Sequence, residues 1–288
     1  MIPESLKKKP YSKTVRLAPL LFLCLTYNLA AQTIEWKRQP AAVPELALFH
    51  STQVLHLPTA ETLQKGDLQF EILHRFDLPV STGYGQFYGL DGTVTMRIGL
   101  GYALTDHMLA TLARSNREGN IELQYKYKAL EIPGDLFPVM VSAQAGIAYN
   151  GKPVQEIADP SRKFQYFGQI IANTMIDKKF GIGLVPSYLY NAHIYCKDIQ
   201  HSFTLGGYLQ HYIWSRWSLI FEYNATISGW RDQYDSMALG IELETGGHFF
   251  KFSFGNSTML NMSQYMQGAP DKIDSNNWHL GFNITRLF

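Results

Sequence analysis

The sequence predicts an all-β protein: a single transmembrane, antiparallel, up-and-down β-barrel of about 12 strands. Three observations lead to this prediction. Segments in which apolar and polar residues alternate recur along the chain, as in strands with one apolar and one polar face. The connections between these segments mostly alternate between short and long. The N-terminal residues have the pattern of a secretory signal. Charged residues make up only 17% of the chain and the mean hydropathy is -0.13, which excludes a helical membrane protein.

Residues 1–31 are expected to be a signal peptide. Their apolar core, Leu17 to Leu29, ends at the small residues Ala30 and Ala31 and is shorter than the ~20 residues of a membrane-spanning helix. Removing the segment takes away five of the 25 basic and one of the 24 acidic residues, so the formal net charge changes from +1 to −3. No basic patch is present, and we expect no nucleic-acid partner. The positive residues before the core are Lys7, Lys8, Lys9, Lys13 and Arg16.

Residues 32–66 are expected to form an N-terminal lead-in on the periplasmic side, or a plug segment folded into the barrel mouth. Prolines interrupt this segment, and Leu48 to Leu57 is a short candidate strand. His50 and His56 occur here, but two histidines without a third ligand do not indicate a metal site. We predict no catalytic residues, no cofactor and no metal for the chain.

The barrel is predicted to span residues 67–288. The alternation of apolar and polar positions is clearest in 92–103, 120–130 and 216–227. The expected strands are 67–77, 92–103, 107–116, 120–130, 137–149, 164–176, 180–190, 201–213, 216–227, 234–245, 248–256 and 276–288.

The predicted connections are sorted by length. Short turns on one rim and long loops on the other are typical of a bacterial outer-membrane barrel, whereas a soluble sandwich has no reason to sort its loops in this way. Residues 131–136 are intermediate, and the short connection 117–119 breaks the pattern. The tight turns are 104–106, 177–179, 214–215 and 246–247, and the longer loops are 78–91, 150–163, 191–200, 228–233 and 257–275.

One hairpin can be predicted in register. If Gly246 and Gly247 form a two-residue turn, they supply the positive φ angles that such a turn requires. Residues on the two strands then lie opposite each other when their numbers sum to 493. The register places Leu243 opposite Phe250, Ile241 opposite Phe252 and Leu239 opposite Phe254, with Glu242 opposite Lys251 on the inner face.

The last predicted strand, 276–288, has an apolar face and ends on an aromatic residue. Taken alone it fits a soluble sandwich equally well, but in this context we expect it to close the barrel against residues 68–76. A terminal strand ending in Phe resembles the signal that the outer-membrane assembly machinery recognises. We therefore assign an assembly role to Trp278, Phe282 and Phe288. Arg286 interrupts the apolar face and is expected to reach the membrane interface.

Several stretches resemble an uncharacterised family of outer-membrane β-barrels from Bacteroidota, a domain of unknown function. They are residues 65–77, 88–108, 112–116 and 123–130, and the resemblance extends over most of the mature chain. It implies a β-barrel in the outer membrane of a Gram-negative bacterium. It carries no catalytic residues and names no activity.

Charged residues at polar positions of the strands are predicted to face the lumen. They could pair across strands and fill the interior, or line a narrow pore and select solutes. The predicted lumen-lining residues are Glu71, Arg75, Arg97, Glu122, Lys126, Glu222, Glu242 and Lys251, and Lys128 has the same pattern.

Two functions of different class remain open, with a third less expected. The first is a narrow channel for small polar solutes, and the second is a non-conducting barrel that has a structural or partner-docking role. The third is a surface lipase or protease. His74, His211 and His248 fall at lipid-facing positions, but no Ser/Asn motif accompanies them, so we expect no enzyme. The expected partners are outer-membrane lipid, the barrel-assembly machinery and, for a channel, a small polar solute.

Two further features have structural explanations. Met259, Met262 and Met266 lie in the longest loop, where they could bind Cu(I) but more simply form an apolar patch that docks a partner or covers the mouth. Cys196, the single cysteine after residue 31, is expected to be a loop residue and not a nucleophile.

Overall fold

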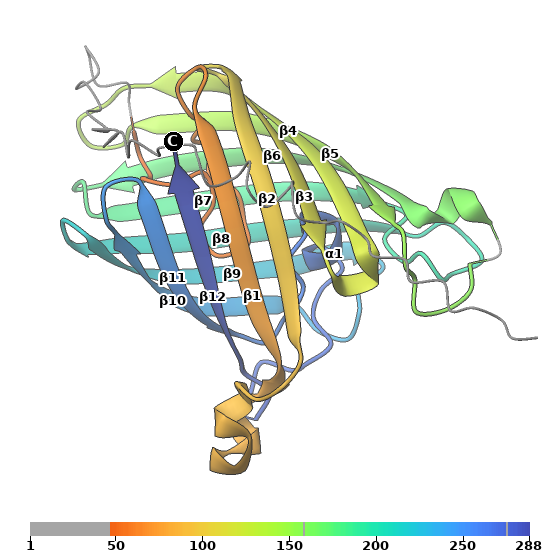
Figure 1. Ribbon diagram of the computed structural model, residues 1–288. Helices are drawn as coiled ribbons and strands as arrows, with labels where there is room; N and C mark the ends of the chain where they lie inside the picture. Colours follow the sequence, from red (N-terminus) through yellow and green to blue (C-terminus); the bar gives the residue numbers. More distant parts are fainter. Residues whose placement is uncertain (1–46, 158, 275) are drawn as a thin grey trace, which may run out of the picture. The chain divides into compact units, whose positions relative to one another are not determined.

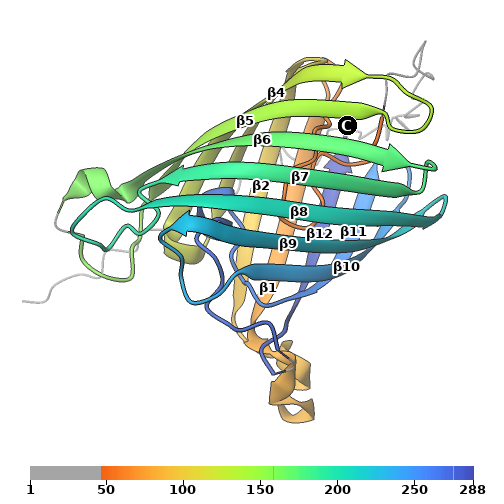
Figure 2. The same ribbon diagram turned by 180° about the vertical axis from the view of Figure 1, so that it is seen from behind.

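The computed structural model describes residues 47–157, 159–274 and 276–288. The predicted signal peptide and residues 32–46 lie outside this part of the chain. Twelve antiparallel strands follow one another around a closed barrel, and β12 pairs with β1 (Figures 1 and 2). The prediction of a twelve-stranded up-and-down barrel is therefore confirmed. The strands are β1 (Leu68–Pro79), β2 (Val94–Thr105), β3 (Met108–Ser115), β4 (Asn120–Ile132), β5 (Val139–Asn150), β6 (Phe164–Ile176), β7 (Phe180–Tyr190), β8 (His201–Trp214), β9 (Trp217–Gly229), β10 (Ser236–Glu244), β11 (His248–Gly255) and β12 (His279–Leu287).

The strands alternate between an apolar outer face and a polar inner face. In β2, Ile98 and Leu100 are 42% and 54% exposed on the outside, whereas the neighbouring Arg97 is only 2% exposed on the inside. This is the period of two that the sequence shows. Closure joins the first strand to the last, so no strand is left with an unpaired edge, as a hydrocarbon environment requires.

The β10–β11 hairpin has the predicted register. Leu243 pairs with Phe250 and Glu242 with Lys251, and φ is 59° at Gly246 and 93° at Gly247. The Lys251 ammonium lies 3.0 Å from the Glu242 carboxylate, inside the barrel. The predicted two-residue glycine turn and its internal ion pair are both confirmed.

The last strand closes the barrel but is shorter than predicted. It begins at His279, so Trp278 lies just before it, stacked on Phe254 with ring centroids 4.8 Å apart. The Trp278 carbonyl accepts a hydrogen bond from the Val80 amide at 2.7 Å, next to the Pro79–His279 pair at the end of the β1–β12 ladder. At the other end, the Phe288 amide donates to the Leu68 carbonyl and completes the seam with β1.

We call the two ends of the barrel the turn rim and the loop rim. The start of β1 and the end of β12 lie at the turn rim. Five short connections also lie there: β2–β3, β4–β5, β6–β7, β8–β9 and β10–β11. The β1–β2 connection lies at the loop rim and contains 3₁₀ turns at Val80–Thr82 and Tyr84–Gly89. The β3–β4 and β5–β6 connections also lie there, with 3₁₀ turns at Arg117–Gly119 and Pro160–Lys163. No helix in the described residues is long and apolar enough to cross a membrane.

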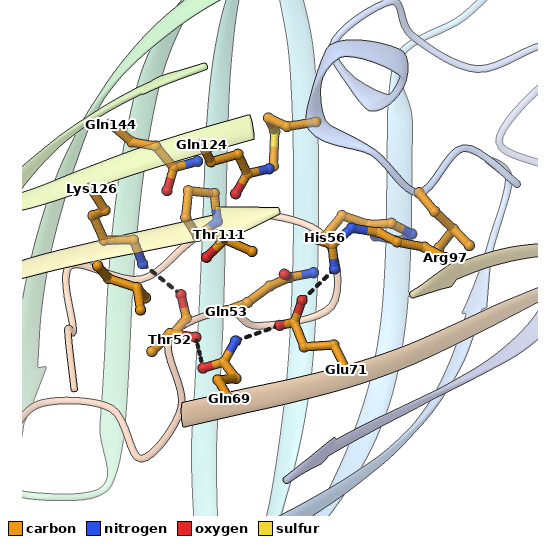
Figure 3. Close-up of a pocket in the computed structure, with 14 residues that line it drawn as sticks. Thr52, Gln53, His56, Gln69, Glu71, Arg97, Thr111, Gln124, Lys126 and Gln144 are labelled. Carbon is orange, nitrogen blue, oxygen red and sulfur yellow. Dashed lines mark hydrogen bonds and ion pairs between the residues drawn. The ribbon is translucent and has the colours of Figure 1, made fainter. Parts of the chain in front are cut away.

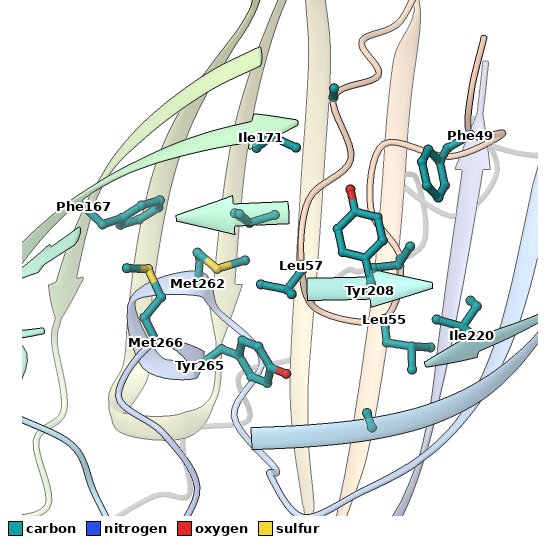
Figure 4. Close-up of a cluster of buried hydrophobic side chains, with 14 of the residues drawn as sticks. Phe49, Leu55, Leu57, Phe167, Ile171, Tyr208, Ile220, Met262, Tyr265 and Met266 are labelled. Carbon is teal, nitrogen blue, oxygen red and sulfur yellow. The ribbon is translucent and has the colours of Figure 1, made fainter. Parts of the chain in front are cut away.

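The lumen is occupied by two segments of the chain itself. Residues 47–66, which we call the plug hairpin, lie inside the barrel next to the turn rim. Residues 256–270, which we call the inner loop, contain the short helix α1 (Met262–Tyr265). They are mostly buried in the lumen, between the hairpin and the loop rim (Figure 1). Apolar side chains of the two segments and of the wall form one buried cluster, which includes Leu55, Leu57, Met262 and Tyr265 (Figure 4).

Candidate functional site: the plugged lumen

The structure places all eight predicted lumen residues inside the barrel. Each is at most 4% exposed, and they come from β1, β2, β4, β9, β10 and β11. They do not line an open passage, because most of them bind the plug hairpin or the inner loop. Lys128, which has the same pattern, is also buried and pairs with Glu131 at 2.6 Å.

The plug hairpin enters and leaves at the turn rim. Near its start His50 Nδ1 lies 2.5 Å from a carboxylate oxygen of Glu244, at the end of β10. At its far end the Lys65 amide donates to Asp106 in the β2–β3 turn at 2.7 Å. Between them the chain reverses at residues 54–57, where the Val54 amide donates to the Leu57 carbonyl at 2.9 Å. The segment is therefore a re-entrant hairpin whose tip points into the lumen.

Glu222 of β9 holds the tip of the hairpin. Its Oε2 accepts hydrogen bonds from the amides of Leu55, His56 and Leu57, at 3.3, 2.9 and 2.9 Å. Its Oε1 lies 2.8 Å from His56 Nδ1. A buried carboxylate that accepts several N–H groups forms strong, charge-assisted hydrogen bonds. One wall residue thus fixes both the backbone and a side chain of the tip.

His56 joins the hairpin to the wall and to the inner loop. Its Nε2 accepts a hydrogen bond from Arg75 Nε at 3.2 Å, so the proton of a neutral ring must lie on Nδ1, where it is donated to Glu222. Burial, with the charge of Arg75 adding to it, lowers the pKa of His56 below its ordinary value, which fits this neutral form. The imidazole also stacks on Tyr265 of the inner loop, with centroids 4.3 Å apart and planes 4° from parallel.

Two lysines from opposite parts of the wall hold the arms of the hairpin. Lys126 of β4 donates to the Thr52 carbonyl at 2.9 Å (Figure 3) and to the carbonyls of Thr59 and Glu61 at 2.8 and 3.2 Å. Lys251 of β11 donates to Ser51 Oγ at 2.8 Å and to the Val54 carbonyl at 2.9 Å, besides its ion pair with Glu242. Both ammonium groups are therefore satisfied by the hairpin backbone, which lacks a sheet partner of its own.

Glycines on the inner face make room for the apolar side chains of the hairpin. A Cβ atom added at Gly206 would lie 2.7 Å from Leu57, and one at Gly240 would lie 2.7 Å from Leu55. One at Gly181 would lie 2.6 Å from the Phe49 ring. Sequence reasoning missed these sockets. The sequence feature that could have predicted these sockets is a glycine at an inward position in each of three strands, where a charged or polar side chain is otherwise usual.

The inner loop is held in the same manner from the β2–β4 wall. Glu122 accepts from the amides of Met262 and Ser263 at 3.1 and 2.8 Å, and Arg97 donates to Asn261 at 3.0 Å. Met262 and Met266 are 5% and 0% exposed. Of the two predicted roles for this apolar patch, docking a partner is not available to these two residues, because they pack inside the barrel against the hairpin and wall.

Little space remains in the lumen. A cavity of about 20 Å³ lies between the hairpin and the β1–β5 wall, and it is about large enough for one water molecule (Figure 3). Its lining is mostly polar and includes the ion pair between Glu71 and Arg97. In the described part of the chain no three His, Cys, Asp or Glu residues are grouped as a metal site would require.

The three lipid-facing histidines contact other side chains of the wall. His74 stacks on Phe282 and His211 on Phe180, with centroids 4.5 and 4.2 Å apart. His248 Nδ1 lies 2.7 Å from Arg286. Cys196 is a free, half-buried thiol in the loop between β7 and β8.

Among curated proteins, none matches the sequence. The NanC porin, solved in a rhombohedral crystal form, is 10% identical with a TM-score of 0.46 over 76% of this chain and 98% of its own. The KdgM porin is 5% identical with a TM-score of 0.44, over 77% and 98%. The COG4313 outer membrane channel from Pseudomonas putida F1 is 12% identical with a TM-score of 0.46, over 80% and 98%.

A family model gives the assignment. The model described as a membrane bound beta barrel domain (DUF5777) matches residues 49–288, which include most of the plug hairpin and every strand. The expected resemblance to a barrel family of unknown function is confirmed, while a Bacteroidota source stays a prediction. The chain therefore belongs to the DUF5777 family of membrane-bound β-barrel domains.

Proposed function

We propose that this protein is an outer-membrane channel for small polar solutes and that the plug hairpin is its gate. The turn rim then faces the periplasm, since both ends of the barrel domain and the short turns lie there, and the loop rim faces outward. In this proposal the structure represents the closed state, in which the cavity between the hairpin and the β1–β5 wall holds about one water molecule.

The observation that carries this proposal is the way in which the hairpin is attached. In the described residues, the backbone-to-backbone hydrogen bonds of its tip region are internal, Val54 to Leu57 and Thr59 to Thr52. Before Gly66, whose amide donates to the Ala103 carbonyl of β2, its hydrogen bonds with the wall involve side chains, chiefly Glu222, Lys126 and Lys251. A segment held in this way can leave without breaking a strand ladder. Withdrawal toward the turn rim would expose an inner face rich in Glu, Lys, Arg and Gln, which suits polar solutes.

Conductance of refolded protein in planar bilayers tests the gate. The wild type is expected to conduct in rare openings, whereas a variant lacking residues 47–60 is expected to show a steady and larger current. A matched variant locks the gate. Ser142 Oγ lies 2.6 Å from the Ala60 carbonyl, so A60C with S142C, in a C196S background, is chosen to join hairpin and wall by a disulfide, whose formation is checked by thiol titration. Oxidation should abolish the openings and a reductant should restore them.

Two results would overturn the proposal. One is a correctly assembled deletion variant, recognised by heat-modifiable migration, that passes no current in any salt. The other is a cross-linked barrel that conducts as well oxidised as reduced. The cysteine pair keeps the test decisive if the deletion variant fails to fold.

A second candidate is a non-conducting barrel with a structural or docking role. The observation in its favour is that the inner loop packs on the hairpin tip through the His56–Tyr265 stack, so the lumen is closed from both ends. This reading predicts silence from both the deletion variant and the reduced cysteine pair. Met262 and Met266 are buried, so they would not form the docking surface. The exposed loops of the loop rim would have to form it instead.

The proposal assigns no enzymatic activity. Of the three histidines considered for a surface hydrolase, His74 and His211 stack on phenylalanines and have no carboxylate or hydroxyl partner among their described contacts, and His248 contacts Arg286. A general base needs a group that orients it and a proton donor within hydrogen-bond reach. Hydrolysis of phospholipid or peptide by the refolded barrel would contradict this part of the proposal.

A further inference from the structure

An apolar groove lies on the outer surface of the barrel, over β5 to β9. Its volume is about 620 Å³, within the range of sites that bind small organic molecules. No charged side chain lines it. Its exposed walls include Ile170 of β6, Phe203 and Leu205 of β8, and Ile227 of β9. These strands form the broad face of the barrel seen in Figure 2.

The groove exists because two residues leave the wall incomplete there. Gly168 of β6 has no atom within 4 Å of the position of a Cβ, so the missing side chain leaves a notch. Pro186 of β7 has no N–H to donate, and proline is otherwise rare in the middle of a sheet. The β6–β7 pairing runs in one register on both sides, from Gln169 with Ser187 to Ala172 with Leu184, but the two pairs between them are missing.

The inner side of this seam is polar and closed. Gln144 Nε2 donates to Gln169 Oε1 at 3.0 Å, and Gln169 Nε2 donates to Ser187 Oγ at 3.0 Å. All three residues that make these hydrogen bonds also line the groove, and Gln144 borders the lumen cavity as well. The groove therefore lies over the interrupted β6–β7 pairing, where an apolar occupant would keep water from the unpaired backbone.

The position of the groove along the strands decides what that occupant is. Toward the loop rim the groove ends at Tyr188, whose hydroxyl contacts His201 Nδ1, and Tyr166 and Tyr190 lie beside it with ring centroids 6.0 Å apart. Aromatic residues of this kind mark the boundary between headgroups and hydrocarbon. The groove extends from that boundary toward the middle of the barrel, the depth at which acyl chains lie.

We propose that this groove is a binding site for one lipid acyl chain, held in a fixed position rather than exchanging with the surrounding lipid. The chain lies against Gly168 and Pro186, between Ile170 on one side and Leu205 on the other, with its headgroup end near Tyr188. It fills the notch that the glycine leaves and covers the backbone opposite the proline. The proposal depends on membrane placement and is independent of whether the lumen conducts.

Native mass spectrometry of the barrel, refolded and released from micelles containing a defined phosphatidylethanolamine, tests the site. The wild type is expected to keep one phospholipid at collision energies that strip all others. Gly168→Leu fills the notch with a side chain for which there is open space, so the barrel should fold and lose that one lipid. Gly207→Leu is the matched control, because Gly207 lies in β8 outside the groove and a Cβ there would meet only a carbonyl at 3.8 Å.

Retention by the wild type and the Gly207→Leu variant, with loss in the Gly168→Leu variant, would support the site. A wild type that loses every lipid together, or a Gly168→Leu variant that keeps one, would overturn it. So would a wild-type dimer that the Gly168→Leu substitution converts to a monomer, since the groove would then be an interface between copies. Pro186→Val gives a second test, because restoring an N–H should complete the ladder and weaken lipid retention even if the Gly168→Leu variant folds poorly.

Discussion

Individual residues of the wall have two roles that depend on which segment they meet. Glu242 and Lys251 form an ion pair that can be predicted from the register, but Lys251 also binds the hairpin backbone. Glu222 has no cationic partner on a neighbouring strand among its described hydrogen bonds and instead accepts from three amides and a histidine of the hairpin. Strand alternation tells which side chains point inward, but the partner of each is decided by a segment distant in sequence.

His50 should make docking of the plug hairpin depend on pH. Its hydrogen bond to Glu244 raises the pKa of His50 above the ordinary value, against the opposing effect of burial. A raised pKa means that the docked state binds the proton more tightly. The stabilisation is therefore fully present below the ordinary pKa of about 6.5 and is lost as the pH rises through the docked-state pKa.

Amide hydrogen exchange of residues 47–60, measured across this pH range and corrected for intrinsic rates, provides the check. Protection in the wild type should fall on the alkaline side more steeply than in the His50→Gln variant. Taking the difference between the two profiles isolates His50 from His56 and other groups. Identical profiles would show that the ion pair with Glu244 contributes nothing to docking.

At the scale of elements, the strands and turns follow from local rules, whereas the hairpin depends on shape complementarity. Sequence periodicity locates β6 and β7 to the residue, and the paired glycines locate the β10–β11 turn. Leu55 and Leu57, by contrast, resemble residues of any short strand. They are buried only because two glycines later in the chain leave space for them on the inner face. Gly206 of β8 makes room for Leu57, and Gly240 of β10 makes room for Leu55.

Substitution of one socket glycine should displace the hairpin and leave the barrel intact. Gly206→Leu puts a side chain where Leu57 now lies, and overpacking of this kind costs about 1–3 kcal/mol. The hairpin, held mainly by side chains, is expected to yield before the strand ladder. Limited proteolysis should then cut residues 47–60 several times faster than in the wild type, with unchanged heat-modifiable migration.

The adjacent Gly207→Leu substitution serves as the control, because Gly207 points outward and has no contact with the hairpin. Equal cleavage rates in the two variants would mean that the sockets do not hold the hairpin. Loss of the barrel itself in the Gly206→Leu variant would mean that hairpin and barrel fold as one unit.

At the scale of the whole molecule, the barrel closes through its last strand. β12 pairs with both β11 and β1, so every other strand depends on it for a closed ladder. Phe282 faces outward in this strand, and Phe288, which follows it, is 48% exposed. The assembly role that the sequence suggests for Trp278, Phe282 and Phe288 stays a prediction, and Trp278, outside the strand, is the least direct participant.

Replacing Phe282 and Phe288 together by serine should block assembly. The physical reason is that the terminal aromatics present the closing strand to the assembly machinery, and an unclosed barrel exposes two strand edges. Cell fractionation should find the double variant in the periplasm and without a heat-modifiable form. Phe252→Ser is the control, since Phe252 is 63% exposed on the outer face of β11 but is far from the end of the chain. Normal assembly of the double variant would refute the role.

Sequence patterns predict the strand number, the inner and outer faces of the clearly alternating strands and one complete hairpin register, and the eight charges expected in the lumen lie inside the barrel. These features follow from a two-residue period and from turn chemistry, which act between residues close in the chain. The filling of the lumen, by contrast, depends on contacts between distant parts of the chain. His56 and Glu222 are 166 positions apart, and no local pattern encodes their contact. The closed barrel alone brings such residues together, because it turns the inner faces of all strands toward the same small volume.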